Sequence, residues 1–278
     1  MPIYIDLHVH TTASDGSMTP AEIVRYAYEK GLAAVAITDH DTMDGVEQAL
    51  EEGRKLGFEV IAGVEISVDF MPEMHLLGYF LDGHYEPILN TLQDLREKRE
   101  YRNPRIVSKL NDLGIEISMS EVDKKAGGSI ISRAHIARVL VEKGYVADME
   151  EAFDKYLAFG RKAYVKKEKL APDEGIAAII RSGGIPVLAH PIYLDMTMAQ
   201  LDNLLGELAE AGLKGIEAYY TDNTASQTEE LLQLAKRHSL VATGGSDFHG
   251  SFKPEIELGS GRGLLRVPYS VLEQLRNV

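Results

Sequence analysis

The chain has 278 residues, of which 45% are hydrophobic, and a formal net charge of −14 at pH 7. This length is sufficient for one large core that carries a sizeable insertion. The acidic balance excludes a broad basic surface for long nucleic acid or anionic membrane. Because there is no cysteine, disulfides and thiolate metal ligands are excluded, and any metal must be bound by histidine and carboxylate groups.

The N-terminus lacks the basic and apolar arrangement of a signal peptide, and no apolar run reaches the length of a membrane span. No internal repeat or low-complexity linker divides the chain. We therefore expect a cytoplasmic protein that does not bind membrane.

Short apolar runs rich in Val, Ile, Leu and Ala predict seven strands, most of them separated by segments with helical spacing. The runs lie near residues 3–9, 33–38, 59–67, 74–81, 185–190, 214–219 and 240–245. The first helix has clear signals, with Thr19 as N-cap, Pro20 as its first residue and Gly31 after its end. Alternating helices and fully apolar strands predict a parallel sheet buried on both faces. Seven strands favour a closed α/β barrel over an open sheet.

Residues 84–165 break this rhythm, because helix is predicted after helix and no central strand is found. We expect a barrel formed by residues 1–83 and 166–278, with 84–165 as a helical insertion that supplies one wall of the site. Basic residues of this region are candidate phosphate ligands, since arginine binds phosphate bidentately. A solvated helix surface is an equally good interpretation of any single one. The candidates are Arg99, Arg102, Arg133 and Lys166.

Histidine and carboxylate residues gather at the ends of the predicted strands. His8 and His10 stand two apart, so their side chains share one face of a strand, and Asp15 follows nearby. Strand ends are where parallel α/β folds place their sites. The candidate ligands are His8, His10, Asp15, His40, Glu65, His75, His190, Asp247 and His249. These are too many for one ion, and two or three adjacent divalent ions suit hydrolysis of a phosphate ester.

Other acidic residues near these ligands have supporting roles in this interpretation. Asp6 shares the face of His8 one step deeper in the strand, so we expect it to hydrogen-bond a ligand histidine. Asp39 and Asp41 either orient His40 or mark the start of a helix. His135 is expected to be a packed or hydrogen-bonded helical residue.

In chain order, the motifs resemble those of the PHP (polymerase and histidinol phosphatase) phosphoesterases over nearly the whole length. They are Asp-Leu-His-Val-His-Thr-Thr-Ala-Ser-Asp-Gly at 6–16, Ile-Thr-Asp-His-Asp at 37–41, Gly-Val-Glu at 63–65, His75, Ala-His-Pro at 189–191 and Gly-Ser-Asp-Phe-His-Gly at 245–250. The last motif and the insertion look most like the stand-alone branch that acts on nucleotides. That branch includes a nucleoside 3′,5′-bisphosphate phosphatase and 5′-3′ ribonucleases.

The resemblance implies a distorted seven-stranded (β/α) barrel with a helical insertion and a trinuclear site of Mn, Fe or Zn. The implied ligand sets are His8, His10, Glu65 and Asp247 for one ion, Asp15, His40 and His249 for the second, and Glu65, His75 and His190 for the third. Glu65 would bridge two ions, and a metal-bound hydroxide would attack the phosphate ester. The implied catalytic residues are His190, Glu65 and Asp247, with His190 as a candidate proton donor to the leaving ribose oxygen. Arg133 is the preferred phosphate ligand, because Ser-Arg-Ala-His at 132–135 matches a family motif.

The expected substrate is a small phosphorylated nucleotide or a short oligoribonucleotide, without binding of long duplexes. Two other functions stay open. Histidinol-phosphate phosphatase uses the same metal cluster on a related barrel, and a non-catalytic nucleotide sensor would keep the metals without turnover. Amidohydrolases also begin with His-x-His, but the Asp-Phe-His ending at 247–249 argues against them. We make no prediction of the oligomeric state.

Overall fold

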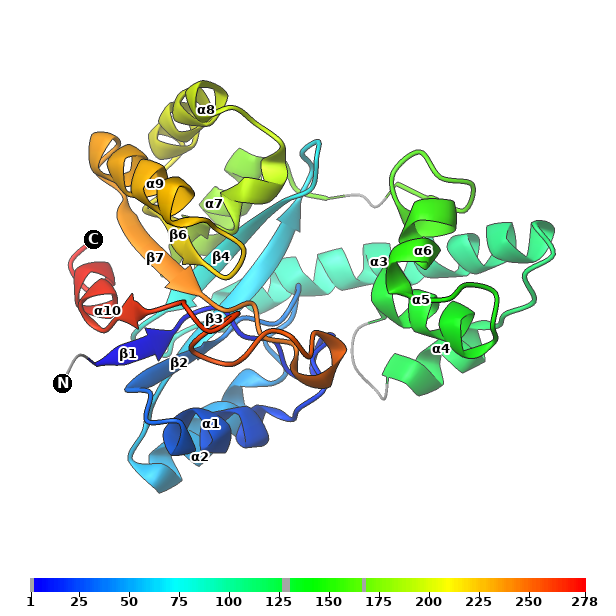
Figure 1. The fold of residues 1–278 in the computed structure, drawn as a ribbon, viewed down its shortest axis with the longest axis horizontal. Coiled ribbons are helices and arrows are strands. Elements are labelled where there is room, and N and C mark those ends of the chain that lie inside the picture. Colours follow the sequence, from blue (N-terminus) through cyan, green and yellow to red (C-terminus); the bar gives the residue numbers. More distant parts are fainter. Residues whose placement is uncertain (1–2, 127–130, 167–168) are drawn as a thin grey trace. The chain divides into compact units, whose positions relative to one another are not determined.

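The computed structural model describes residues 3–126, 131–166 and 169–278, and the chain divides into two compact units (Figure 1). The barrel unit consists of Met1–Thr91 and Lys169–Val278, and the insertion unit of Leu92–Glu168. The sequence analysis placed the boundaries at residues 83/84 and 165/166. Both boundaries lie further along the chain in the structure, at 91/92 and 168/169, and the first of them falls inside the long helix Glu86–Asp112.

The barrel unit is built on one eight-stranded sheet with the spatial order β7-β6-β5-β4-β3-β2-β1-β8. The strands are β1 (Tyr4–Asp6), β2 (Ala34–Ile37), β3 (Glu59–Val68), β4 (Met74–Phe80), β5 (Ile185–Leu188), β6 (Gly215–Tyr220), β7 (Val241–Gly245) and β8 (Val267–Pro268). The sheet curls back on itself, because the Leu7 N–H donates to the Gly244 carbonyl at 3.2 Å. The α/β barrel predicted from the sequence is therefore confirmed. The eighth strand, only two residues long, was too short to leave a pattern.

Strand direction departs from the parallel sheet that the sequence predicted. β1, β2 and β3 run parallel, and so do β5, β6 and β7, but β4 is antiparallel to both β3 and β5. The chain turns straight back through residues 69–73 instead of crossing over through a helix. As a result the first residues of β4 lie at the edge where the parallel strands end, and Ser67 pairs with His75 there.

Helices cover the outside of the barrel sheet (Figure 1). They are α1 (Pro20–Glu29), α2 (Val46–Leu56), α7 (Pro172–Arg181), α8 (Met198–Glu210), α9 (Ala225–Arg237) and α10 (Ser270–Leu275). α1 begins where the sequence predicted, because Thr19 Oγ1 accepts from the Glu22 N–H at 3.3 Å and the Glu22 carboxylate accepts from the Thr19 N–H at 2.8 Å. The helix buries Ile23 and Val24.

A buried apolar cluster supports the strands that carry the polar residues. It takes alternate residues from neighbouring strands, such as Leu77 and Tyr79 on β4, and extends to α10. The Tyr79 hydroxyl donates to the Leu7 carbonyl at 2.9 Å, which satisfies a polar group inside this core. Burial of each large apolar side chain stabilises the fold by about 1.5–3 kcal/mol.

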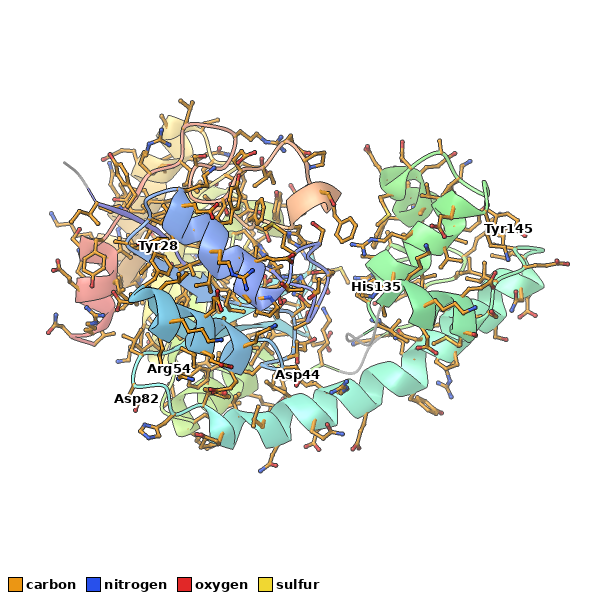
Figure 2. All side chains as sticks on the ribbon, turned by 90° about the horizontal axis from the view of Figure 1, so that it is seen from below. Tyr28, Asp44, Arg54, Asp82, His135 and Tyr145 are labelled. Carbon is orange, nitrogen blue, oxygen red and sulfur yellow. The ribbon has the colours of Figure 1, made fainter. Side chains whose placement is uncertain are left out.

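The described residues of the insertion unit form helices joined by turns and loops, with no strand among them. It contains the main part of α3 (Glu86–Asp112), then α4 (Met119–Ala126), α5 (Arg133–Glu142), α6 (Met149–Ala152) and a π-helical turn (Phe153–Leu157). It has its own core, which includes Leu110, Val122, Ile136 and Leu140. His135, labelled in Figure 2, is buried and its Nδ1 accepts from the Ser132 N–H at 3.0 Å. This is the structural role expected for it. Among the described helices, none combines the length and the apolar composition that a membrane crossing requires.

Candidate metal centre

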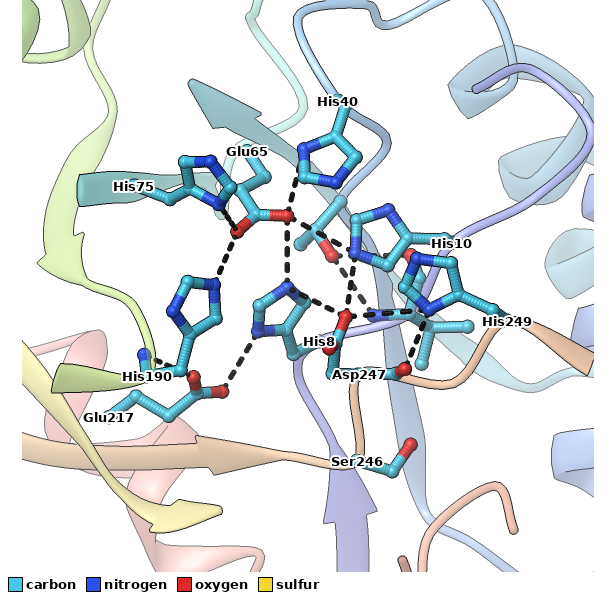
Figure 3. Close-up of polar contacts among 12 residues, drawn as sticks. His8, His10, His40, Glu65, His75, His190, Glu217, Ser246, Asp247 and His249 are labelled. Carbon is cyan, nitrogen blue, oxygen red and sulfur yellow. Dashed lines mark hydrogen bonds and ion pairs between the residues drawn. The ribbon is translucent and has the colours of Figure 1, made fainter. Parts of the chain in front are cut away.

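The nine predicted metal ligands all lie in one cluster of the barrel unit, at the edge where the parallel strands end. Figure 3 shows most of them pointing into a common space around Glu65. β4 supplies its ligand from its first residues because it runs in the opposite direction. The cluster comprises His8 and His10 after β1, Asp15 from the following loop, His40 after β2, Glu65 in β3, His75 in β4, His190 after β5, and Asp247 and His249 after β7.

Glu65 occupies the centre of the cluster and is almost fully buried. Its Oε1 lies 2.7 Å from His75 Nδ1 and 2.9 Å from His190 Nε2. Its Oε2 lies 3.1–3.2 Å from ring nitrogens of His8, His10 and His40. The two oxygens of Glu65 therefore face different sets of histidines.

Two further carboxylates complete the cluster. Asp15 Oδ1 lies 3.4 Å from His249 Nε2 and 3.8 Å from His10 Nδ1. Asp247 Oδ1 lies 3.1 Å from His10 Nε2 and 3.7 Å from His8 Nε2. Three groups of residues bring their ligand atoms within 4.8 Å of one another: His10, Asp15, His40 and His249; His8, His10 and Glu65; His40, Glu65 and His75. The groups share His10, His40 and Glu65.

The cluster contains buried polar atoms that a cation would satisfy. Nδ1 of His10 is buried and makes no hydrogen bond among the described residues; His10 Nε2 and His40 Nδ1 make none of good geometry, although carboxylate oxygens lie 3.1–3.2 Å away. Buried polar atoms without a hydrogen bond are rare because each costs about 1–3 kcal/mol. Imidazole and carboxylate donors without sulfur suit Mn, Fe or Zn. The residues present therefore fit a divalent metal centre.

The protonation states of the cluster agree with this fit. Burial lowers the pKa of His40 to about 3, so its ring is neutral and offers a lone pair near pH 7. Burial alone would raise the pKa of Glu65, but His40, His75 and His8 hold it well below its usual range, so this carboxylate is ionised. Burial alone would lower the pKa of His10, yet Asp247 and Glu65 raise it to about 9. A metal ion would displace the proton that this ring otherwise holds.

Glu217 in β6 is a functional residue that the sequence analysis missed. Its side chain is fully buried, the His8 Nδ1–H donates to its Oε1 at 3.0 Å, and the His190 N–H donates to its Oε2 at 2.7 Å. This partner fixes the proton on Nδ1, so that Nε2 of His8 faces the cluster. The signal was present in the sequence, because Glu217 is the single acidic residue within an apolar run of residues 215–220.

Asp6 and Asp39 hold loops instead of ligand rings. Asp6 accepts from the backbone N–H groups of His8, Ser246 and Gly259 at 3.3, 2.9 and 2.7 Å. The expected bond from Asp6 to a histidine ring is wrong, because both carboxylate oxygens are occupied by these N–H groups and by the Ser246 hydroxyl. Asp39 accepts from the Thr11 N–H at 2.7 Å, and from the hydroxyl groups of Thr11 and Ser14, so it fixes the loop that leads to Asp15.

The sequence profile of the PHP domain matches residues 6–254. The chain belongs to the PHP family. The 5′-3′ exoribonuclease Rnm of Escherichia coli (strain K12) is 36% identical over 260 residues, which cover 92% of this chain and 88% of that protein. The 3′,5′-nucleoside bisphosphate phosphatase of Chromobacterium violaceum is 33% identical over 250 residues, which cover 88% of this chain and 87% of that protein.

Solved structures share this PHP fold over the whole chain. A protein of Bifidobacterium adolescentis, described as a metal-dependent phosphoesterase, superposes with a TM-score of 0.86 at 31% identity and covers 99% of this chain and 96% of its own. The family and the enzyme class predicted from the motifs are confirmed: the chain is a PHP phosphoesterase, a hydrolase of phosphoric esters.

The backbone of the PHP site is strained at two of its predicted ligands. His190 has a φ of 25° and Asp247 a φ of 57°, in a region that residues with a Cβ rarely adopt. Asp41, next to His40, has a φ of 50°. Strain of this kind collects at functional sites, where surrounding hydrogen bonds hold a side chain in a required direction.

The predicted phosphate ligands Arg102, Arg133 and Lys166 belong to the insertion unit. Arg102 is buried on α3. Arg102 and Lys166 both line a cavity of about 390 Å³. Arg133 begins α5 and donates to the Leu157 carbonyl at 3.2 Å. Arg99 also lies on α3, and its side chain is outside the described part of the structure. Phosphate binding by these four residues stays a prediction.

Proposed function

We propose that this protein is a metal-dependent phosphoesterase that hydrolyses a phosphate ester of a nucleotide, either a nucleoside 3′,5′-bisphosphate or the 5′ end of a short RNA. The observation that carries the proposal is the single buried cluster of histidines and carboxylates around Glu65. The nucleotide substrate is supported by the names of the relatives from Escherichia coli and Chromobacterium violaceum. A cytoplasmic location stays part of this proposal.

We propose three divalent ions, either Mn, Fe or Zn, held by the seven residues of the overlapping groups described above together with His190 and Asp247. Glu65 would be shared by two of the ions, and Asp247 would hold one through Oδ1. When bound, such ions activate water as a nucleophile and neutralise charge on the phosphoryl group. Their local positive charge attracts an anionic substrate to a chain with a net charge of −14.

Other residues of the chain hold the predicted ligands in position. Glu217 keeps Nε2 of His8 directed at the cluster, and it also holds the backbone of His190. His190 is the proposed proton donor to the leaving oxygen. Because its Nε2 also lies 2.9 Å from Glu65, donor and ligand roles compete for one nitrogen. His190→Ala separates the roles, since loss of a ligand lowers metal content and loss of a donor alone does not.

The non-reacting phosphate of the substrate is assigned to the basic residues of the insertion unit, with Arg133 first. An arginine donates two parallel hydrogen bonds to a phosphate and remains charged at every physiological pH. In this proposal the second phosphate of the substrate adds a charge-assisted contact with arginine, which strengthens binding beyond what one phosphate gives.

The proposal is tested by turnover with manganese on one panel of substrates. The panel holds a nucleoside 3′,5′-bisphosphate, a short 5′-phosphorylated oligoribonucleotide and histidinol phosphate, with Glu65→Gln as the matched inactive control. We expect the nucleotide substrates to have the highest kcat/KM. Faster hydrolysis of histidinol phosphate would make the protein a histidinol-phosphate phosphatase. Nucleotide binding without turnover by the fully metal-loaded protein would make it a sensor.

A further inference from the structure

One lysine of the barrel unit lies directly against the metal cluster, and none of the roles above uses it. Lys253 follows the short turn of Gly250–Phe252, and its Nζ donates to Asp247 Oδ2 at 2.8 Å. The Tyr220 hydroxyl donates to the same oxygen at 2.9 Å. Oδ1 of Asp247 is the oxygen that faces His10. Lys253 is therefore placed on the side of Asp247 that the histidines leave open.

Metal binding alone does not explain a cation at this position. A lysine is charged near pH 7, and its repulsion of a nearby divalent ion lowers the affinity of the site for metal. The same charge attracts an anionic phosphoryl group that is held next to the ions. The side chain of Lys253 is 38% exposed, so part of it is open to solvent beside the cluster. Its position favours a contact with substrate.

An exposed aromatic ring lies near this lysine, and Tyr220 links the two through its hydroxyl group. Tyr193 follows His190 in a short 3₁₀ helix, is 49% exposed, and has its ring centre 5.4 Å from that of His190. The Tyr220 hydroxyl lies 3.5 Å from the Tyr193 hydroxyl and bonds the carboxylate that Lys253 contacts. Lys253 and Tyr193 are thus neighbours at one edge of the cluster, with Tyr220 between them.

The Tyr193 ring is held in place although one half of it is open to solvent. Its hydroxyl donates to Asp222 Oδ2 at 2.5 Å, and the Arg262 Nε–H donates to Asp222 Oδ1 at 2.8 Å. A fixed ring loses little conformational entropy on binding, which suits it to stacking. Bases of single-stranded nucleic acids stack on exposed tyrosines of this kind.

We propose that Lys253 and Tyr193 form a nucleotide-binding edge on the barrel unit. Lys253 contacts a non-bridging oxygen of the phosphoryl group at the metal cluster, and Tyr193 stacks on the base of the same nucleotide. This inference rests on the proposed nucleotide substrate and deepens it. Selection for a nucleotide over another phosphate ester then begins in the barrel unit, independently of the insertion arginines.

The role of Lys253 is tested with Lys253→Met, which keeps the length of the side chain and removes its charge. We expect a non-hydrolysable phosphonate analogue of the nucleoside 3′,5′-bisphosphate, which keeps a phosphoryl group at the metal cluster, to bind the manganese-loaded variant at least about tenfold more weakly in calorimetric titrations. Its metal content should equal or exceed that of the wild type, because a neighbouring positive charge is gone. Lys253→Arg should restore most of the affinity. A variant that loses metal, or binds the nucleotide as the wild type does, would overturn this assignment.

Tyr220→Phe is the matched control, since it removes the other donor to Asp247 Oδ2 and leaves the lysine charge in place. We expect nucleotide affinity close to that of the wild type. Equal losses in Tyr220→Phe and Lys253→Met would show that both act through Asp247, which contradicts direct contact between Lys253 and substrate.

The role of Tyr193 is tested by comparing a nucleoside 3′,5′-bisphosphate with ribose 3,5-bisphosphate, which lacks the base. Tyr193→Ala should raise KM about tenfold for the nucleotide and leave KM for the base-free ester unchanged. Tyr193→Phe keeps the ring and should resemble the wild type. Equal effects on both substrates would overturn the stacking role. If the wild type hydrolyses no nucleotide, the proposed function fails; if it does and the variants match it, only this inference fails.

Discussion

The barrel unit and the insertion unit place their charged side chains in different surroundings. In the barrel unit, the carboxylate of Glu65 is 1% exposed and lies among five histidine rings. In the insertion unit, ion pairs such as Lys143 with Glu121 and Arg161 with Asp154 lie at the surface. Burial of a charge costs several kcal/mol unless partners compensate it, whereas exposed pairs change stability little. The buried, convergent charges are therefore the ones that point to a bound cation.

Removal of the central carboxylate should have the largest effect. Glu65→Gln keeps the size of the side chain and removes the charge that faces both sets of histidines. We expect loss of more metal than in His75→Ala, since the bridge serves two ions, and loss of nearly all phosphoesterase activity. Elemental analysis and turnover on a nucleoside bisphosphate measure both effects. Equal metal loss in the two variants would contradict the bridging role.

Glu217 tests whether the buried partners of the ligands are as necessary as the ligands. Glu217→Gln cannot accept from both the His8 ring and the His190 N–H in the present arrangement. We expect metal affinity or activity to fall by about 10–100-fold, as for other hydrogen-bond partners of metal-bound histidines. Titration of the protein with metal ions in a calorimeter measures the affinity, and turnover on a nucleoside bisphosphate measures the activity. Wild-type affinity together with wild-type turnover would show that His8 is oriented by other contacts.

The insertion unit should affect substrate binding without affecting metal content. Arg133→Ala should lower kcat/KM for a phosphorylated nucleotide about tenfold or more, which corresponds to a charge-assisted contact of about 1.5–3 kcal/mol. Its metal content should stay normal. Arg161→Ala is the control from the same unit, because the Arg161 side chain is 52% exposed. Unchanged kinetics in Arg133→Ala would return this residue to a structural role.

The same contact predicts a preference between substrates. A nucleoside 3′,5′-bisphosphate should be hydrolysed with a kcat/KM roughly ten times that of the matching 3′-monophosphate, because the second phosphate adds one charge-assisted contact. The ratio should shrink toward one in Arg133→Ala. Comparable values for the two substrates in the wild type would contradict the assignment of the second phosphate to arginine.

The smallest effect is expected at the surface of the insertion unit. Lys143→Met removes the exposed pair with Glu121. We expect metal content and turnover to be unchanged and the thermal unfolding midpoint to move only slightly, because exposed ion pairs contribute little. A large change in activity would show that the surface of the insertion unit matters more than the comparison suggests.

The comparison also explains which features could be predicted from the sequence. Ligands such as His190 directly follow apolar runs, so their location at one edge of a barrel could be predicted. The direction of β4 could not, because a strand buried on both faces has the same apolar pattern in either direction. Glu217 was missed although it stands out as an acidic residue in an apolar run, because its role depends on partners 27 and 209 residues away.

The insertion unit was harder to interpret for a physical reason. Its helices were predicted from spacing and glycine boundaries, and the structure contains them. An arginine on a helix follows the same pattern whether it binds phosphate or is only solvated, because both roles place it outside the core. Arg133, whose Nη1 contacts the Leu157 carbonyl, illustrates this, since a local contact of this kind leaves no trace in the sequence.

The most direct test of the central claim is the number of metal ions per chain in gently purified protein. Seven of the nine predicted ligands, Glu65 among them, form three overlapping groups, which are too many ligands for one ion. We expect elemental analysis to find more than one equivalent of Mn, Fe or Zn, approaching three when the protein is fully loaded. A fully active protein that holds a single equivalent, or none, would contradict the account.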